Sequence, residues 1–343
     1  MSYHPKPLGC QGCPAFNDGK SFVRPTGPKD AKIVLVGQGP GQDEALDGQP
    51  FVGPSGKKLD SWLVRAGIRR HECAVGNVVW CWLPGNRPPT QAEVEYCGKA
   101  HWKPWLASLE QARVVVAIGV PAATALLGKG KAKAGFIEPY HQGYILNVAH
   151  PAFILRGNFA EEPLQVEYLK IAKEIADGLR PNLDPEAHLP RDIISNPRLP
   201  DLTRWKSRLS GEGVAIDLET AGDHIRLVGM CDLAPPHSYL AFPIRTQGGG
   251  SYWGDDLGRA VEWLWDFLSD PTIKKVGHNA QAFDIPMLER NGFIVGGFHF
   301  DTMLGMHIAH TGVPKDLETL ARLYLKMPSW KAMVKGDLEG EGK

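Results

Sequence analysis

The segment GQGPGQDEALDGQPFVGPSG, residues 37–56, directly follows the apolar run at residues 33–36 and decides how the first half of the chain is interpreted. A glycine-rich segment at the carboxyl end of a strand lets a ligand approach main-chain N–H groups closely. A phosphate-binding turn is the alternative. The segment lacks both the Gly-Lys-Ser/Thr sequence of a P-loop and the G-x-G-x-x-G helix start of dinucleotide-binding folds.

The first half of the chain alternates short apolar runs with helical patterns. This alternation predicts an α/β fold with a parallel sheet covered by helices on both faces. Ligands of such sheets bind beyond the carboxyl ends of the strands. The predicted strands lie at residues 33–36, 74–79, 114–118 and 144–148, and the predicted helices at 56–66, 90–110, 120–127 and 164–178.

The glycine-rich segment resembles motif A of the family-four, iron–sulfur uracil-DNA glycosylases. The matching positions are Gly37, Pro40, Gly41, Glu44, Gly48, Pro50, Phe51, Val52, Gly53 and Gly56. Two further family features follow in order, Asn77 in GNVVWC and His150-Pro151 in AHPAFILR. The resemblance covers about residues 1–175. It implies a three-layer, parallel-sheet uracil-DNA glycosylase fold and hydrolysis of the N-glycosidic bond of uracil in DNA.

The resemblance implies a role for three side chains in a closed pocket that holds the flipped base. Phe51 stacks on the uracil, a contact worth roughly 1–3 kcal/mol. Asn77 reads the Watson–Crick edge, and His150 donates to the uracil oxygen on which negative charge collects. Taken alone, each residue has an ordinary structural explanation, as a core aromatic, a turn asparagine and a structural histidine. Their joint occurrence with the glycine-rich segment favours the pocket.

Motif A departs from the family pattern at the positions that handle the attacking water. Gln38 replaces the family's glutamate, and Gly39 stands where the family-one enzymes carry a catalytic aspartate. We assign the main chain around Gln38 and Gly39 to the water and the base, and Glu44 to substrate binding. Because acid–base help contributes about 10²–10⁴-fold, the departures predict a slow enzyme, an altered substrate range or lost activity.

Four of the six cysteines form two pairs, Cys10 with Cys13 in C-x2-C and Cys81 with Cys97 in C-x15-C. This arrangement is similar to the four-cysteine signature of the family-four glycosylases, which implies a [4Fe–4S] cluster. A structural zinc ion is the alternative, although zinc sites usually combine two short cysteine pairs. The other two cysteines, Cys73 and Cys231, are predicted to be small buried residues.

Five prolines between residues 179 and 200 predict a linker. The predicted domains are therefore a glycosylase-like domain at 1–178, the linker at 179–200 and a second domain at 201–343. Within the second domain the patterns predict an antiparallel meander followed by helices. The strands are expected at 213–218, 225–231 and 238–243, and the helices at 256–268, 280–291 and 316–325.

The second domain resembles the 3′–5′ exonuclease domain of DNA polymerases, which has an RNase H-like α/β fold. Asp217 and Glu219 in AIDLET lie two apart on a strand, so their carboxylates share one face. Asp284 in GHNAQAFDIPML matches the second motif. The resemblance implies that these acids hold Mg²⁺ or Mn²⁺ for phosphodiester hydrolysis. The third motif, Tyr-x3-Asp or His-x4-Asp, is absent, which predicts a truncated, C-terminally incomplete domain with doubtful exonuclease activity.

The net charge is zero, but residues 1–180 carry 21 Lys and Arg against 16 Asp and Glu. This local excess suits a polyanion, and the expected partner is uracil-containing DNA, single- or double-stranded. Basic residues predicted to contact phosphates, or alternatively to lie in a solvated loop, are Arg156, Lys129, Lys131 and Lys133. A DNA polymerase is the second expected partner, on another chain or as the continuation of this one.

Residues 1–16 contain no apolar core typical of a signal peptide, and no apolar run reaches the roughly 18 residues of a membrane span. We therefore expect a cytoplasmic protein without membrane contact, in a bacterium or a phage-infected host. Two other functions stay open at this point. One is a polymerase-associated exonuclease fragment whose glycosylase-like half only binds DNA, and the other is a non-catalytic DNA-binding module.

Overall fold

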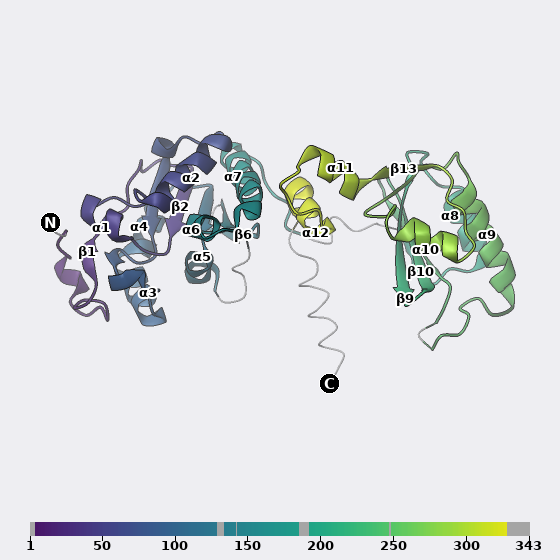
Figure 1. Cartoon of the computed structure of the whole chain (residues 1–343), viewed down its shortest axis with the longest axis horizontal. Coiled ribbons are helices and arrows are strands. Elements are labelled where there is room, and N and C mark those ends of the chain that lie inside the picture. The colour runs from purple at the N-terminus through teal and green to yellow at the C-terminus, as the bar shows by residue number, and fades with distance from the viewer. Residues whose placement is uncertain (1–3, 129–133, 142, 185–191, 247, 328–343) are drawn as a thin grey trace. The chain divides into compact units, whose positions relative to one another are not determined.

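The computed structural model describes residues 4–128, 134–141, 143–184, 192–246 and 248–327 (Figure 1). The chain divides into two compact units. The first comprises Met1–Asp184, Gly312–Pro314 and the chain from Glu318, and the second comprises Pro185–Thr311 and Lys315–Leu317. In the described part of the chain, no helix is long and apolar enough to cross a membrane.

The first unit is built on a five-stranded sheet with the strand order β3-β2-β5-β7-β6. The first four of these strands are parallel, and β6 pairs antiparallel with β7. Their buried runs of valine, isoleucine and leucine are typical of strands covered on both faces. The strands are β2 Ile33–Gly37, β3 Cys73–Asn77, β5 Val114–Ile118, β6 Ile137–Tyr140 and β7 Gly143–Val148.

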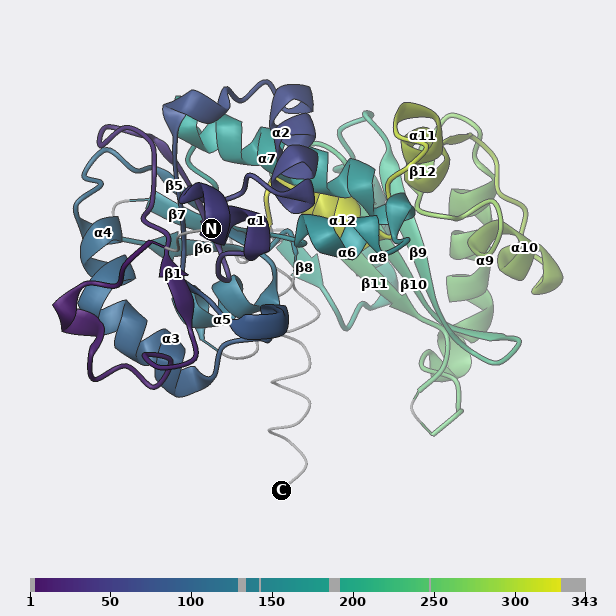
Figure 2. The ribbon, with the colours of Figure 1, turned by 60° about the vertical axis from the view of Figure 1, so that its left-hand side comes forward.

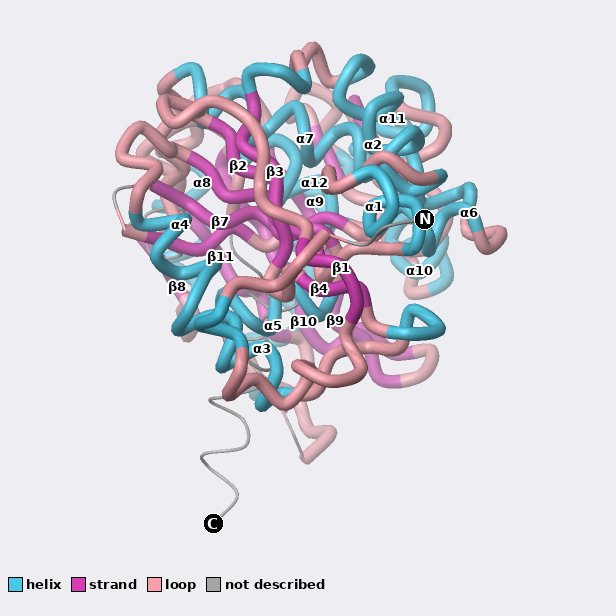
Figure 3. Tube along the Cα trace, turned by 90° about the vertical axis from the view of Figure 1, so that its left-hand side faces the viewer, coloured by secondary structure: helices cyan, strands magenta, loops and turns pink. Residues whose placement is uncertain are grey.

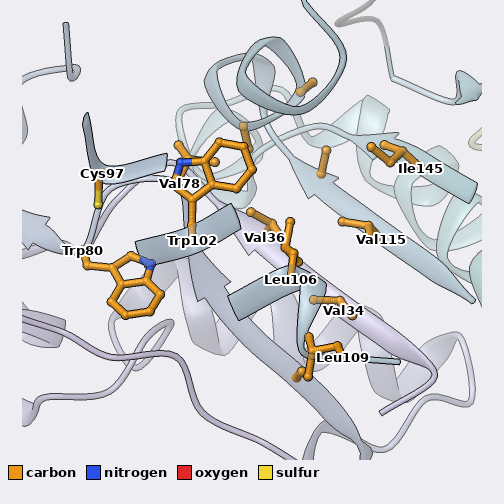
Figure 4. Close-up of a cluster of buried hydrophobic side chains, with 14 of the residues drawn as sticks. Val34, Val36, Val78, Trp80, Cys97, Trp102, Leu106, Leu109, Val115 and Ile145 are labelled. Carbon is orange, nitrogen blue, oxygen red and sulfur yellow. The ribbon is translucent and has the colours of Figure 1, made fainter. Parts of the chain in front are cut away.

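Helices cover both faces of this sheet, as the sequence predicts. On one face α7, Glu162–Asp177, packs across β2, β5 and β7, and α2, Pro54–Arg65, lies against α7 (Figure 2). On the other face alternate strand residues, among them Val34, Val36 and Val115, form a buried cluster with α4, Lys103–Ala107, and α5, Val120–Leu127 (Figure 4). The remaining α-helices of this unit before residue 184 are α1 Gln42–Asp47, α3 Gln91–Cys97 and α6 Pro151–Leu155.

The helix predicted at residues 90–110 is confirmed over residues 91–107, but it contains a π-helical turn that the sequence does not predict. The structure has α3, then a π-helical turn at Gly98–Trp102, then α4, which ends at Ala107. The indole of Trp102 folds back over Gly98, where an added Cβ would lie 2.9 Å from its Nε1. Pro104 supplies no amide hydrogen, so it cannot continue the hydrogen-bond ladder of the preceding turn. The hydrophobic pattern alone does not reveal this π-helical turn.

A small two-stranded sheet that the sequence does not predict joins the N-terminal segment to the middle of the unit. β1, Lys20–Phe22, pairs antiparallel with β4, Cys81–Trp82 (Figure 3). The pairing brings the segment that carries Cys10 and Cys13 to the strand that carries Cys81.

The second unit contains a six-stranded sheet with the order β13-β12-β9-β10-β11-β8. The predicted antiparallel meander is its centre, formed by β9 Val214–Ala221, β10 His224–Asp232 and β11 Ser238–Pro243. Its buried face forms a core with α8, Leu199–Lys206, and α9, Leu257–Ser269. The other helices are α10 Asp284–Arg290 and α11 Thr302–Ala309, and the shorter strands are β8 Asp192–Ile194, β12 Lys275–Gly277 and β13 Phe298–Asp301.

Three residues of the predicted linker, Asp192–Ile194, form the edge strand β8, which pairs parallel with β11. Proline is compatible with strand edges, so the proline-rich pattern does not exclude such a strand. The helix predicted at 316–325 corresponds to α12, Leu317–Leu320, and a π-helical turn, Ala321–Leu325. From Glu318 on, this segment belongs to the first compact unit rather than to the second. The domain boundaries stay a prediction.

Candidate active site

A cavity of about 650 Å³ opens at the carboxyl-terminal edge of the parallel sheet in the first unit. Strands β2, β3 and β7 are parallel, so the residues at and just after their carboxyl ends meet at this edge. All six residues that the sequence assigns to catalysis and uracil binding line the cavity, namely Gln38, Gly39, Glu44, Phe51, Asn77 and His150. They come from segments more than 100 residues apart in the chain.

Gly37 lets the ring of Phe51 and the amide of Asn77 come together. A Cβ at this position would lie 2.5 Å from both Asn77 Oδ1 and Phe51 Cζ, so no larger residue fits. Phe51 itself has a φ of +58°, an uncommon conformation for a bulky residue. Such strain at a cavity is typical of functional positions that the surrounding structure holds in place. The ring centroids of Phe51 and His150 are 6.3 Å apart with an interplanar angle of 30°.

Glu44 holds the motif A loop closed. Its buried carboxylate accepts hydrogen bonds from the backbone N–H of Gly41 at 2.9 Å and of Gly53 at 3.1 Å. These bonds connect the two glycine turns that flank α1. A carboxylate bonded to two main-chain donors positions the loop, which makes Glu44 a positioning residue. A direct contact between Glu44 and uracil stays a prediction.

His150 is held in one tautomer. It is the N-cap of α6, and its Nδ1 accepts a hydrogen bond from the backbone N–H of Ala152 at 3.1 Å. A neutral imidazole with Nδ1 as acceptor carries its proton on Nε2. Burial, reinforced by the positive charge of Arg156, lowers the pKa of His150 to about 4. At neutral pH the side chain is therefore an uncharged N–H donor.

Side chains at the mouth of the cavity complete the site, and motif comparison did not single out most of them. Arg87 lines the cavity and pairs with Glu93 at 2.7 Å and with Asp18 at 2.7 Å. Hydrogen bonds from Arg87 lower the pKa of both carboxyls. Phe153 and Arg156, both exposed on or next to α6, also line the cavity. The predicted phosphate contacts Lys129, Lys131 and Lys133 lie outside the described residues.

The four cysteines of the two pairs lie near one another in the first unit. Cys10, Cys81 and Cys97 are buried, and Cys13 is half-buried. All are free thiols. Burial raises the pKa of Cys81 and of Cys97 to about 12, and the charges of neighbouring cysteines from the same set add to both shifts. The charge of Cys13 likewise adds to the raised pKa of Cys10, whose largest cause is burial.

Four cysteine side chains supply the soft sulfur donors that iron–sulfur clusters take. Among the described residues, no three His, Cys, Asp or Glu side chains stand close enough to hold one metal ion. A four-iron cluster is larger than one ion and spaces its thiolates further apart, so a loose group of four soft sulfur donors is compatible with it. Cys73 is buried but donates to the carbonyl of Arg69, and Cys231 is half-buried in the second unit.

In the second unit the three predicted metal-binding acids stand on β9 and at the start of α10. Asp217 and Glu219 are exposed on one face of β9, and the buried Asp284 accepts a hydrogen bond from the backbone N–H of Leu218 at 3.0 Å. Burial, then the charges of Asp217 and Asp301, raises the pKa of Asp284 to about 6. Carboxylate oxygens are the donors that Mg²⁺ and Mn²⁺ prefer. Among the described residues, however, these acids do not form a group that could hold one metal ion as they stand.

Asp301 is a fourth acid of this group that the sequence comparison did not single out. It is buried and caps α11, where its carboxylate accepts the N–H groups of Met303 and Leu304. It also accepts the N–H groups of Asn279 and Gln281. The aspartate before a short helix was the available signal, because aspartate is a preferred N-cap residue.

Comparisons with known proteins agree with this geometry. Residues 24–173 match the family model of the uracil DNA glycosylase superfamily. The type-4 uracil-DNA glycosylase of Archaeoglobus fulgidus is 32% identical over 189 residues, which cover 51% of this chain and 92% of the relative. Those of Thermotoga maritima and Pyrobaculum aerophilum are 35% and 34% identical and are covered to 81% and 93%. The chain belongs to the type-4 uracil-DNA glycosylase family.

This type-4 family member also carries a second recognisable part. Residues 199–340 match a family model described as 3′-5′ exonuclease. Among solved structures, the EXD2 exonuclease domain soaked in Mg and dGMP is 25% identical with a TM-score of 0.24, and the match covers 37% of this chain and 64% of that chain. A nuclease in its apo form is 19% identical with a TM-score of 0.29.

Gln38 and Gly39, the two positions that the sequence assigns to the attacking water, carry no carboxylate in this type-4 glycosylase family member. Gln38 is half-buried, and its carbonyl accepts the N–H of Val79 at 3.0 Å. An added Cβ at Gly39 would meet nothing nearer than the carbonyl of Val79 at 3.6 Å, which is an ordinary contact. The loop therefore has room for a side chain at residue 39, and its glycine is not a steric requirement.

Proposed function

We propose that the first unit is a uracil-DNA glycosylase that hydrolyses the bond between uracil and deoxyribose in DNA. The observation that carries the proposal is that Phe51, Asn77 and His150 line one cavity at the strand ends. A flipped pyrimidine needs an aromatic face on which to stack and an amide that hydrogen-bonds to its edge. It also needs a fixed N–H donor that stabilises its negative charge as it leaves.

The chemistry follows from the state of His150. The bond between the sugar C1′ and uracil N1 breaks, and its electron pair leaves with the base. The Nε2–H of the neutral imidazole donates to the uracil oxygen that receives the charge. In a partly buried site, a donor that is already in position stabilises this charge more than a hydrogen bond from water does. A water molecule then bonds to C1′ and releases its proton to solvent, because Gln38 and Gly39 offer no carboxylate.

Base selection is assigned to Asn77. Its amide is buried at the end of β3, beside the Phe51 ring, and it can pair with the carbonyl and the N–H of uracil. Cytosine presents the opposite donor and acceptor at this edge. Sites built on such hydrogen bonds discriminate strongly, since a mismatched partner leaves a buried polar group unpaired.

Cys10, Cys13, Cys81 and Cys97 are proposed to hold a [4Fe–4S] cluster. When bound, the cluster supplies a structural crosslink rather than a reacting group. Its four cysteine ligands would then connect the N-terminal segment to β4 and to the end of α3, next to the cavity, which Cys81 also lines. Anaerobically purified protein is expected to be brown, with about four irons per chain. Protein that contains one zinc ion and no iron contradicts this assignment.

The decisive assay uses a labelled oligonucleotide with one uracil, followed by alkali, in the presence of EDTA. We expect cleavage only after alkali, because the proposed glycosylase leaves an abasic site and uses no divalent ion. Oligonucleotides with cytosine or thymine at the same position, single- and double-stranded, are the substrate controls, and Asn77→Asp is the protein control. Tight binding of the uracil oligonucleotide without any abasic product would reduce the unit to a DNA-binding module.

The second unit is proposed to hold Mg²⁺ or Mn²⁺ through Asp217, Glu219 and Asp284. When bound, the ions would activate water and stabilise the charge of a phosphodiester under attack. The chemistry of the carboxylates and the effect of the Asp217 charge on the pKa of Asp284 support metal binding, while the absence of the third motif from the sequence argues against exonuclease activity. Metal-dependent shortening of the oligonucleotide from its 3′ end, lost in Asp217→Asn, is the corresponding test. DNA is the proposed partner of both units, and an associated polymerase and a cytoplasmic location remain predictions.

A further inference from the structure

Aromatic rings surround the first cysteine of the proposed cluster site. The Nε2 of His101 lies 3.1 Å from the Sγ of Cys10. The His101 ring stacks on Trp80, with centroids 5.2 Å apart and an interplanar angle of 22°, and meets the edge of Phe22 at 5.1 Å. Neither His101 nor Trp80 takes part in the uracil chemistry described above.

Trp80 connects this group to the uracil-reading residue. Its indole N–H donates to the main-chain carbonyl of Asn77 at 2.8 Å, and its backbone N–H donates to the Cys97 thiol. Trp80 is buried, and Figure 4 shows it beside Cys97 at one end of the hydrophobic cluster. Trp80 therefore contacts Cys97, which is a proposed cluster ligand, and Asn77 at the end of β3. It also contacts His101, which lies against Cys10, a second proposed ligand.

The direction of the hydrogen bond between His101 and Cys10 follows from ligand chemistry. A cysteine that binds iron is a thiolate and can only accept, so Nε2 must carry the proton. Hydrogen bonds to cluster sulfurs are among the factors that set the reduction potential. Groups that orient metal ligands in this way usually contribute strongly to metal retention.

We propose that His101 is a positioning residue of the iron–sulfur site, which donates to the Cys10 thiolate and, through its stacking on Trp80, links that ligand to Asn77. The inference rests on the cluster assigned under the proposed function. Through the pair Trp80–His101, the positions of the cysteine ligands and the positions of the residues in the uracil pocket would thus depend on each other.

The test compares His101→Phe, which keeps a stacking ring but removes the donor, with His101→Gln, which keeps a donor. His71→Phe, an exposed histidine in the same unit, is the matched control. In His101→Phe we expect loss of cluster absorbance to a chelator about tenfold faster and a more negative reduction potential. His101→Gln is expected to recover part of both values, and His71→Phe to match the wild type.

A second variant tests the link to Asn77. Trp80→Phe keeps the ring and loses the indole N–H, so the Asn77 carbonyl loses its donor. Asn77 contacts uracil before and during bond breaking, so its displacement is expected to raise KM about three- to tenfold while kcat changes less. Iron content should stay close to that of the wild type. An unchanged KM in an iron-containing Trp80→Phe protein overturns the link.

The outcomes separate this inference from the proposal on which it depends. Wild-type protein without iron after anaerobic purification overturns the cluster and the inference together. Iron-loaded, folded His101→Phe protein with wild-type bleaching rate and potential overturns the role of His101 alone. Circular dichroism melting of each variant establishes that it is folded, and the partial recovery expected in His101→Gln distinguishes a lost donor from a general packing defect.

Discussion

His150 in the uracil cavity and Asp284 in the second unit are both ionisable side chains in buried surroundings, and their pKa values move in opposite directions. The pKa of His150 falls to about 4, and that of Asp284 rises to about 6. Burial is the largest cause of both shifts, because surroundings of low polarity favour the uncharged form. The same physical effect therefore has different consequences in the two units.

For the histidine the uncharged form is the working form. A neutral imidazole with its proton fixed on Nε2 is a ready donor to the departing uracil, so the fold alone prepares this site. For the aspartate the uncharged form does not suit the proposed role, because a metal ligand must be deprotonated. The proposed metal site in the second unit would therefore need a bound cation to favour the ionised carboxylate.

The largest effect is expected when the N–H donor of His150 is removed. His150→Ala should reduce the single-turnover rate of uracil release by about 10²–10³-fold, the usual loss for one preorganised donor. Uracil release from an oligonucleotide is the measurement, and the exposed His71→Ala is the control. A loss of less than threefold in folded protein would remove His150 from the mechanism.

A smaller effect, in the opposite direction, is expected from the water-handling position. Gly39→Asp places a carboxylate where the loop has room, and we expect uracil release to become about tenfold faster. Gly37→Ala is the contrasting variant, because its Cβ would collide with Asn77 and Phe51, and it should lower the rate. If Gly39→Asp is no faster than wild type, water activation does not limit this enzyme.

In the second unit, replacing Asp284 should stabilise the protein. A carboxyl group whose pKa is raised in the folded state stabilises the protein most at pH values below its pKa in the unfolded state. This contribution to stability is lost as the pH rises through about 6. Asp284→Asn removes the free-energy cost of burying the ionised carboxylate, and it keeps an oxygen that accepts the Leu218 N–H. We expect about 1–2 kcal/mol more stability at pH 8 and less gain at pH 5. Denaturant unfolding at both pH values is the measurement, and equal gains contradict the shift.

The smallest expected effect is a flat pH profile for the glycosylase. With the pKa of His150 near 4, kcat/KM should vary less than about twofold between pH 5.5 and 8. The lowered pKa also means that the unfolded chain binds more protons, so acidification from pH 6.5 toward 4 should destabilise wild type more than His150→Gln. A kinetic transition near pH 6.5 would show that the imidazole titrates as an exposed histidine.

The sequence predicted the parallel strands of the first unit with small errors at their ends. Runs such as Val114–Ile118 carry the signal in their own residues, because a strand covered on both faces is apolar throughout. It missed β12 and β13, which are only three and four residues long and therefore too short to show a hydrophobic pattern. It also missed the π-helical turn inside the predicted helix, which depends on how Trp102 packs over Gly98.

The chemical identity of the pocket was determined by the sequence: the glycine-rich segment, the asparagine, the histidine and the cysteine pairs are all legible as residue types in order. The tertiary structure decided their states. The tautomer of His150 depends on the Ala152 N–H, the task of Glu44 on two glycine amides, and the contact of His101 with Cys10 on a turn 91 residues away. Residue order specifies which groups exist, whereas hydrogen bonding and burial arise only between segments that folding brings together.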